Sequence, residues 1–201
     1  MGIFSGILGK NIIAVIVAMF MQFNVAGATE VAPQDTATEF MTAVTTCDTQ
    51  YLKRYQDNKY VNFLINIKGE TKAEKKLIKR LNEALFKNFS YEIVATEERE
   101  TAAVAKVRIK GNNFSDVLEN YEAASYAYVT GNLYSDTVED KQKLNEKCLE
   151  LYVEEVEKAA KKKPKHKSVI YIPMLSNGSN GWDVLVKNKM MKKMLCGLKT
   201  P

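Results

Sequence analysis

The chain has 201 residues, of which 46% are hydrophobic and 26% are charged, and this composition is typical of a globular protein and excludes a disordered or low-complexity chain. The length favours a single domain. The formal net charge is +5, but the basic residues are spread over predicted helix faces without interleaved aromatic residues, so binding to nucleic acid is not predicted.

Residues 1–28 are predicted to form a secretory signal peptide. Lys10 precedes an apolar run from Ile12 to Val25, and the small residues Ala26-Gly27-Ala28 follow where a signal peptidase would cut. The run is shorter than the ~20 apolar residues that span a bilayer, and an uncleaved N-terminal anchor is the alternative. No cysteine directly follows the run, so the residue that is acylated in bacterial lipoproteins is missing there. We therefore expect a secreted or cell-envelope protein.

The mature chain, residues 29–201, is predicted to form a single α+β domain that opens with short helices. Asp35 or Thr36 is predicted to cap the first helix, which should end near Asp48. A second short helix is predicted over residues 49–56. The apolar run at residues 60–67 is assigned to a helix or an irregular packed segment in preference to a strand.

A longer helix is predicted after the capping box that Thr71 and Glu74 form. Apolar residues then recur at helical spacing, while the basic residues of the same helix face outward. The apolar positions are Leu77, Leu81, Ala84 and Leu85, and the outward basic positions are Lys72, Lys75, Lys76, Lys79 and Arg80.

Residues 91–110 are predicted to form a β-hairpin, because apolar and polar residues alternate with the period of two that is typical of a half-buried strand. The charged segment at residues 97–100 should be the turn. A hairpin alone is marginal in water, so further strands or helices must cover its apolar face. The residues expected on that face are Tyr91, Ile93, Ala95, Ala103, Ala105, Val107 and Ile109.

A long helical insertion is predicted at about residues 115–162, broken near Gly131-Asn132 and ending in lysines before Pro164. Two strands follow, at residues 168–175 and 182–186, and a last helical turn is expected within residues 188–198. The predicted fold is therefore α+β. It has a curved antiparallel sheet of about four strands packed on N-terminal helices, with the helical insertion between two hairpins.

Three segments resemble small exported proteins of Gram-positive bacteria: the opening helix with residues 40–44, the strand at residues 101–107, and the closing Gly181-Trp182. Those proteins are mostly lipoproteins of unknown function with a nuclear transport factor two-like (NTF2-like) or cystatin-like domain. The resemblance implies a curved sheet wrapped on helices, often around a pocket, and it implies no catalytic residues. This chain departs from the family in lacking the acylated cysteine and in its long insertion.

The sequence carries no recognisable catalytic or metal-binding motif. His166 is the single histidine and lies among lysines, which predicts a solvated side chain whose protonation is disfavoured. Cys47, Cys148 and Cys196 are widely spaced, so they allow one disulfide at most and give no metal signature. The acidic pairs are predicted to be exposed. We therefore predict neither enzyme activity nor a cofactor nor a metal.

The leading interpretation is a non-enzymatic accessory or binding protein for an unknown small ligand or envelope component. Tyr121, Tyr126, Tyr128 and Trp182 are the candidates for the mouth of a ligand pocket, and a position in the core is the alternative for each of them. Two alternatives stay open: a small-molecule enzyme that uses the pocket of this fold, and a protein that binds anionic wall polymer or lipid headgroups electrostatically. The candidate residues for an anionic partner are Lys161, Lys162, Lys163 and Lys165.

Export can be tested by N-terminal sequencing of the protein that the native host releases. Cleavage after Ala28 predicts a mature chain that begins at Thr29. A soluble cytoplasmic product that retains Met1 would contradict this prediction.

Overall fold

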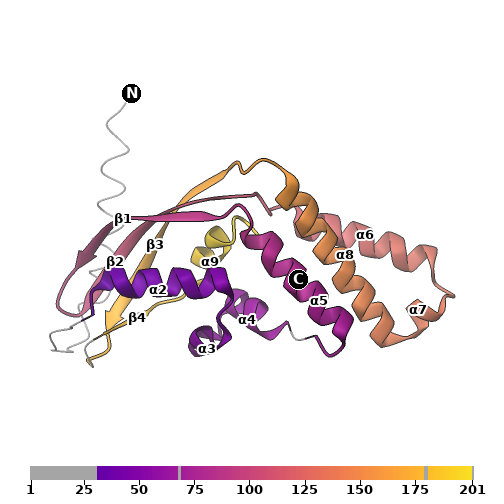
Figure 1. The fold of residues 1–201 in the computed structure, drawn as a ribbon, viewed down its shortest axis with the longest axis horizontal. Helices are drawn as coiled ribbons and strands as arrows, with labels where there is room; N and C mark the ends of the chain where they lie inside the picture. The colour runs from indigo at the N-terminus through magenta and orange to yellow at the C-terminus, as the bar shows by residue number, and fades with distance from the viewer. Residues whose placement is uncertain (1–30, 68, 179–180, 201) are drawn as a thin grey trace.

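The computed structural model describes residues 31–67, 69–178 and 181–200, and the predicted signal peptide lies outside the described residues (Figure 1). Within them, four antiparallel strands form an open sheet in the order β1-β2-β3-β4. The strands are β1 Ser90–Glu98, β2 Ala102–Gly111, β3 His166–Ser176 and β4 Trp182–Val184. The predicted α+β fold with two hairpins is confirmed.

Helices from both ends of the described chain cover one face of the sheet (Figure 1). α2, Pro33–Thr46, packs against β1, β2 and β4, and α9, Asn188–Met194, packs against β3. Between α2 and the later helices lie α3 Thr49–Leu52, η1 Lys53–Tyr55 and α4 Lys59–Asn66, which confirms the helices predicted at residues 49–56 and 60–67. No helix in the described part of the chain combines the length and apolar character needed to cross a membrane.

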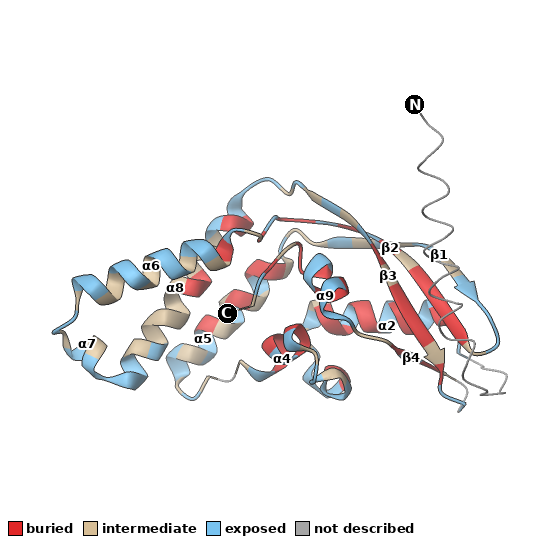
Figure 2. Ribbon diagram, turned by 180° about the vertical axis from the view of Figure 1, so that it is seen from behind, coloured by how far each residue is buried: buried red, intermediate tan, exposed pale blue. Residues whose placement is uncertain are grey.

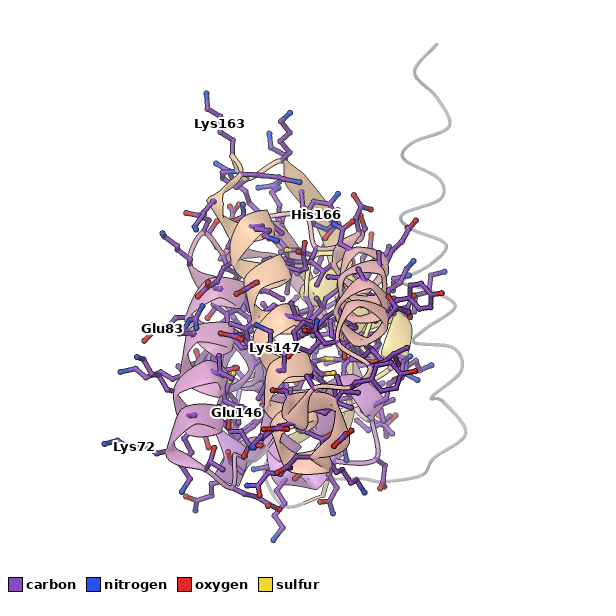
Figure 3. All side chains as sticks on the ribbon, turned by 90° about the vertical axis from the view of Figure 1, so that its right-hand side faces the viewer. Lys72, Glu83, Glu146, Lys147, Lys163 and His166 are labelled. Carbon is purple, nitrogen blue, oxygen red and sulfur yellow. The ribbon has the colours of Figure 1, made fainter. Side chains whose placement is uncertain are left out.

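The predicted helical insertion projects from the sheet between β2 and β3. It consists of α6 Val117–Gly131, α7 Asp136–Glu139 and α8 Lys141–Lys161, and α8 also packs against α5, Lys72–Phe86. We call α5, α6, α7 and α8 the helical arm. α8 lies in the middle of the arm, with α5 on one side and α6 on the other, both from the side and end-on (Figures 1 and 3). The outer faces of α5 and α6 therefore point in opposite directions.

The core lies between the sheet and the covering helices (Figure 2). The inward positions that alternation predicts on β2 are all buried, and they face buried side chains of β3, α2 and α9. The covered face of the sheet is therefore filled by side chains. These include Phe40, Met41, Val44, Ala103, Ala105, Val107, Ile109, Ile170, Ile172, Met174, Met191 and Met194.

The capping box predicted for α5 is present. The Thr71 hydroxyl accepts from the Glu74 backbone N–H at 3.0 Å, and the Glu74 carboxylate accepts from the Thr71 backbone N–H at 3.0 Å. The predicted apolar stripe from Leu77 to Leu85 is buried, and the α5 lysines are turned toward solvent, namely Lys72, Lys75, Lys76 and Lys79.

The first helix starts earlier than predicted. The sequence predicts a cap at Asp35 or Thr36, but α2 begins at Pro33 with Ala32 as its N-cap. Proline suits the first helical position because its φ is already helical and that position needs no N–H donor. Thr36 is instead buried within the first turns of α2.

β1 departs from strict alternation because it contains a β-bulge. The register with β2 shifts between Ile93 and Ala95, which leaves Val94 as the extra residue. Ala95 is therefore exposed, although it is predicted to face the core. The strand also continues to Glu98, so the turn is shorter than the predicted one.

Two asparagines hold the arm where it leaves the sheet. Asn112 is buried, and its amide donates to the carbonyls of Ala159, at 3.2 Å, and Lys162. The Asn112 side-chain oxygen accepts from Asn88 at 2.8 Å, and Asn88 also donates to the Ala160 carbonyl at 3.2 Å. The last carbonyls of an α-helix lack partners within the helix, so these two amides cap α8 and tie it to the strands.

Trp182 tests the packing of α2 against the sheet. Its side chain is buried, and the indole Nε1 donates to the Val31 carbonyl at 3.0 Å. Trp182→Ala should lower the free energy of unfolding by about 3–5 kcal/mol, measured by urea denaturation, because it leaves a large cavity. Trp182→Phe keeps most of the apolar volume and should cost less. A loss below about 1 kcal/mol in Trp182→Ala would contradict the core position.

Candidate functional site

The structure separates the aromatic residues that are predicted to line one pocket mouth. Trp182 lies in the core at the sheet, whereas the three tyrosines lie on α6 of the arm. Tyr121 packs edge-on against Tyr152 of α8, with ring centroids 5.4 Å apart, and Tyr126 is 73% exposed. Tyr128 lines a cleft of the arm. The four side chains therefore do not share one pocket, because the sheet's covered face is filled by the core.

The four lysines predicted to meet an anionic partner lie together at the base of the arm. Lys161 ends α8, Lys162 is its C-cap, and Lys163 and Lys165 lie in the connection to β3. All four are exposed, and the Lys163 side chain points away from the helices in Figure 3. None of them takes part in the ion pairs found among the described residues. Their ammonium groups are therefore accessible.

A bidentate ion pair joins α5 to α8. The Arg80 guanidinium donates from Nε and Nη2 to the two carboxylate oxygens of Glu157, at 2.9 and 2.8 Å. Two parallel charge-assisted hydrogen bonds fix the relative position of the two side chains. The bond to Glu157 raises the pKa of Arg80, and the same bond lowers the pKa of Glu157. Both groups are therefore charged at neutral pH.

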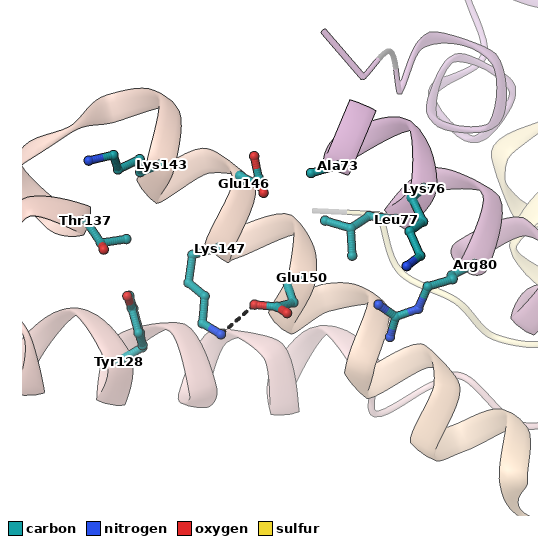
Figure 4. A pocket seen from close by; sticks show the side chains of 10 residues that line it. All are labelled: Ala73, Lys76, Leu77, Arg80, Tyr128, Thr137, Lys143, Glu146, Lys147 and Glu150. Carbon is teal, nitrogen blue, oxygen red and sulfur yellow. Dashed lines mark hydrogen bonds and ion pairs between the residues drawn. The ribbon is translucent and has the colours of Figure 1, made fainter. Parts of the chain in front are cut away.

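A cleft of about 510 Å³ opens beside this ion pair (Figure 4). Lys76 and Arg80 reach into it from α5, and Glu150 reaches into it from α8. The Lys147 ammonium donates to Glu150 at 2.6 Å, which raises the pKa of Lys147. Lys76 and Lys143 form no ion pair within the described residues. The lining is Ala73, Lys76, Leu77, Arg80, Tyr128, Thr137, Lys143, Glu146, Lys147 and Glu150.

A second cleft, of about 440 Å³, lies along the same pair of helices. Arg80 lines both clefts, so we call the two linings together the α5–α8 groove. The groove holds six cationic side chains and four carboxylates, an excess of two positive charges. It includes Lys161 of the predicted lysine cluster. The second lining is Arg80, Glu83, Ala84, Lys87, Glu157, Ala160 and Lys161.

The sequence predicts the outward position of the α5 lysines but not the groove. Lys76 is exposed as expected, yet the periodicity of α5 does not indicate which helix lies beside it. The Arg80–Glu157 pair joins residues 77 positions apart. Basic positions on α5 and acidic positions on α8 are a signal for such a pair, but they identify neither partner.

The groups with the strongest intrinsic reactivity lie outside the groove. His166 is half-buried, and burial lowers its pKa, so the cause is not the neighbouring lysines that the sequence suggests. Cys47, Cys148 and Cys196 are free thiols, and burial raises the pKa of Cys47 to about 11 and that of Cys196 to about 12. No group of three potential metal ligands occurs among the described residues.

The Arg80–Glu157 pair predicts a contribution to stability that is lost in acid. The pKa of Glu157 is lower in the folded chain than its ordinary value of 4.5. The contribution is therefore complete above that value and disappears as the pH falls through the lowered pKa. Wild type and Glu157→Gln should converge in urea denaturation at low pH. Because both side chains are partly exposed, a double-mutant cycle with Arg80→Gln should give a coupling of about 1 kcal/mol or less.

A difference between wild type and Glu157→Gln that stays constant as the pH falls from neutral through the acid range would contradict this prediction, since it would not depend on the charge of the Glu157 carboxylate.

No family model and no curated protein matches this sequence. Among solved structures, the chain is similar to a crystal structure of ycdA, a candidate lipoprotein of Bacillus subtilis strain 168, with 16% sequence identity and a TM-score of 0.43. The match covers 85% of this chain and 48% of that one, so this chain spans about half the length of that protein. A likeness at this level assigns neither a family nor a function, and the NTF2-like or cystatin-like domain stays a prediction.

Proposed function

We propose that this chain is a non-enzymatic accessory protein, secreted or held at the cell envelope, that binds an anionic polymer along the α5–α8 groove. The observation that carries the proposal is that lysines from both helices reach the groove without an ion pair among the described residues. They are Lys76 and Lys87 of the α5 side and Lys143 and Lys161 of α8, continued by Lys162, Lys163 and Lys165.

An extended ligand suits this arrangement better than a single small anion. Lys76 and Lys143 lie in one cleft, and Lys87 and Lys161 lie in the other. At ~1.5 Å per residue, about 27 Å of α8 separates Lys143 from Lys161. A chain of phosphate or carboxylate groups can contact several of these lysines at once, and linked contacts raise the overall affinity.

The ion pairs within the groove add selectivity. Arg80 and Lys147 are already bound by Glu157 and Glu150, so these cations are held in place and contribute little net charge. The carboxylates repel an anionic group that lies beside them. Anionic groups at the spacing of the unpaired lysines are therefore favoured over groups at other spacings.

The proposal gives the groove no catalytic step. Its unpaired cationic groups are lysine ammonium groups, which bind anions through charge and hydrogen bonds. The Cys196 thiol is buried after α9, and with its pKa raised to about 12 it is protonated at neutral pH. A protonated thiol is a weak nucleophile, so binding is the activity that these groups support.

Removing the charges at the base of the arm tests the proposal. In the variant with Lys161→Gln, Lys162→Gln, Lys163→Gln and Lys165→Gln, co-sedimentation with purified cell wall that carries anionic polymer should be lost. The melting temperature should stay nearly unchanged because all four side chains are exposed. Binding by wild type should weaken as salt rises, since the Debye length is about 10 Å at 0.1 M and about 3 Å at 1 M.

A groove variant separates a polymer from a lipid surface, which offer the same phosphate chemistry. Lys76→Gln, Lys87→Gln and Lys143→Gln should weaken binding to wall polymer, because a narrow chain can enter the clefts. The same variant should bind phosphatidylglycerol vesicles like wild type, because a flat surface reaches mainly the exposed cluster at the base. If this groove variant loses binding to vesicles but keeps binding to wall polymer, lipid headgroups are favoured as the ligand.

A matched control removes four exposed lysines that lie outside the groove. The residues are Lys53, Lys110, Lys189 and Lys192. This control should bind wall polymer like wild type, because its groove is intact. If the control and the variant at residues 161–165 lose wall binding equally, the net charge of the protein alone is responsible for wall binding. Retained binding in both would show that the lysines are only a solvated helix end.

A further inference from the structure

α6 has a broad exposed face in the described structure. Only Val117 of its 15 residues is buried, and the helix packs on α8 through its opposite side. Tyr126 is 73% exposed, and the turn after the helix adds Leu133, 52% exposed, and Tyr134, 94% exposed. Large apolar and aromatic side chains exposed together on one surface are typical of an interaction site. The stripe at helical spacing is Glu119, Glu122, Tyr126, Thr130 and Leu133.

The segment that contains this face is acidic, although the chain as a whole is basic. Residues 111–140 include six carboxylates and no lysine, arginine or histidine, whereas the whole chain has a net charge of +5. The six are Asp116, Glu119, Glu122, Asp136, Glu139 and Asp140. A surface of this kind repels polyanions and anionic lipid, and it complements a basic surface.

The other side of the arm supplies a basic surface of matching length. α5 has 15 residues, as α6 does, and its solvent-facing side carries Lys72, Lys75 and Lys79. Lysine stems cover apolar surface while their ammonium groups stay hydrated. An ammonium group can also lie over the face of a tyrosine ring. The outer face of α5 can therefore accept both the glutamates and the tyrosines of α6.

We propose that the outer face of α6 binds the outer face of α5 in a second copy of this chain. Glu119 and Glu122 would meet α5 lysines, and Tyr126 would pack on lysine stems. Contact between two α6 faces is disfavoured, because it would place the same glutamates opposite one another. α5 of a second copy therefore complements α6 in both charge and length.

The arrangement of the arm determines the kind of assembly. α5 and α6 lie on opposite sides of α8, so each copy uses α6 toward one neighbour and α5 toward another (Figures 1 and 3). Such a head-to-tail contact differs on the two partners and is not closed by a two-fold axis. The mean mass in solution should therefore rise with concentration and pass beyond that of a dimer.

Charge reversal tests this contact by sedimentation equilibrium of the purified protein without any polyanion. The α6 variant carries Glu119→Lys and Glu122→Lys, and the α5 variant carries Lys75→Glu and Lys79→Glu. Each variant alone should associate about tenfold more weakly than wild type, because its α6 and α5 faces have like charge. An equimolar mixture should recover the association, because the lysines of one variant then face the glutamates of the other.

Two further variants separate this contact from a change in folding or net charge. Glu97→Lys with Glu98→Lys makes the same charge change on β1, where both side chains are exposed, and should associate like wild type. Tyr126→Ser with Tyr134→Ser should weaken association while the melting temperature stays unchanged. The proposal is overturned if wild type stays monomeric at every concentration, or if the mixture is no heavier than the separate variants. Sedimentation equilibrium of the protein alone does not measure polymer binding. The self-association proposal and the polymer-binding proposal can therefore fail independently.

Discussion

The position of α6, α7 and α8 depends on one constraint: these helices are inserted between two strands that are direct neighbours in the sheet. Gly111 at the end of β2 pairs with His166 at the start of β3, so residues 112–165 must leave and return within one strand spacing, about 4.8 Å. The side chains of Asn112 and Asn88 meet this requirement by capping α8 at its base. The end of β2 is also crowded, because a Cβ at Gly111 would lie 2.7 Å from the Cys196 sulfur.

This anchoring gives the arm a fixed order of helices and, with it, a fixed order of charge. α8 packs against α5 on one side and α6 on the other, so each outer helix uses one stripe for packing and keeps one face for solvent. The solvent face of α5 is basic and that of α6 is acidic, while the lysines that follow α8 lie at the base of the arm. Both proposals therefore place binding on the arm and leave the sheet as its support.

Local patterns predict most of the elements, because their causes are local. The Thr71–Glu74 capping box, the alternation along β2 and the break near Gly131 each depend on residues that are close in sequence. The bulge in β1 was not predictable, because it reflects the register against β2. The groove was missed for a related reason: Arg80 and Glu157 meet only after α8 folds back on α5. The exposure of the lysines after α8 follows from composition. The spacing of Trp182 suits a core position and a pocket mouth equally well, and the structure places its side chain in the core.

The bulge in β1 also affects how the protein behaves at high concentration. β1 has nine residues and lies at the edge of the sheet, and a long edge strand can recruit a strand from another chain and start cross-β aggregation. The irregular register at Ile93–Ala95 and the exposed charges of Glu92 and Glu97 oppose such pairing. The opposite edge is β4, with only three residues. Both edges are therefore poor templates for amyloid growth, which disfavours edge-to-edge association of the sheet at high protein concentration.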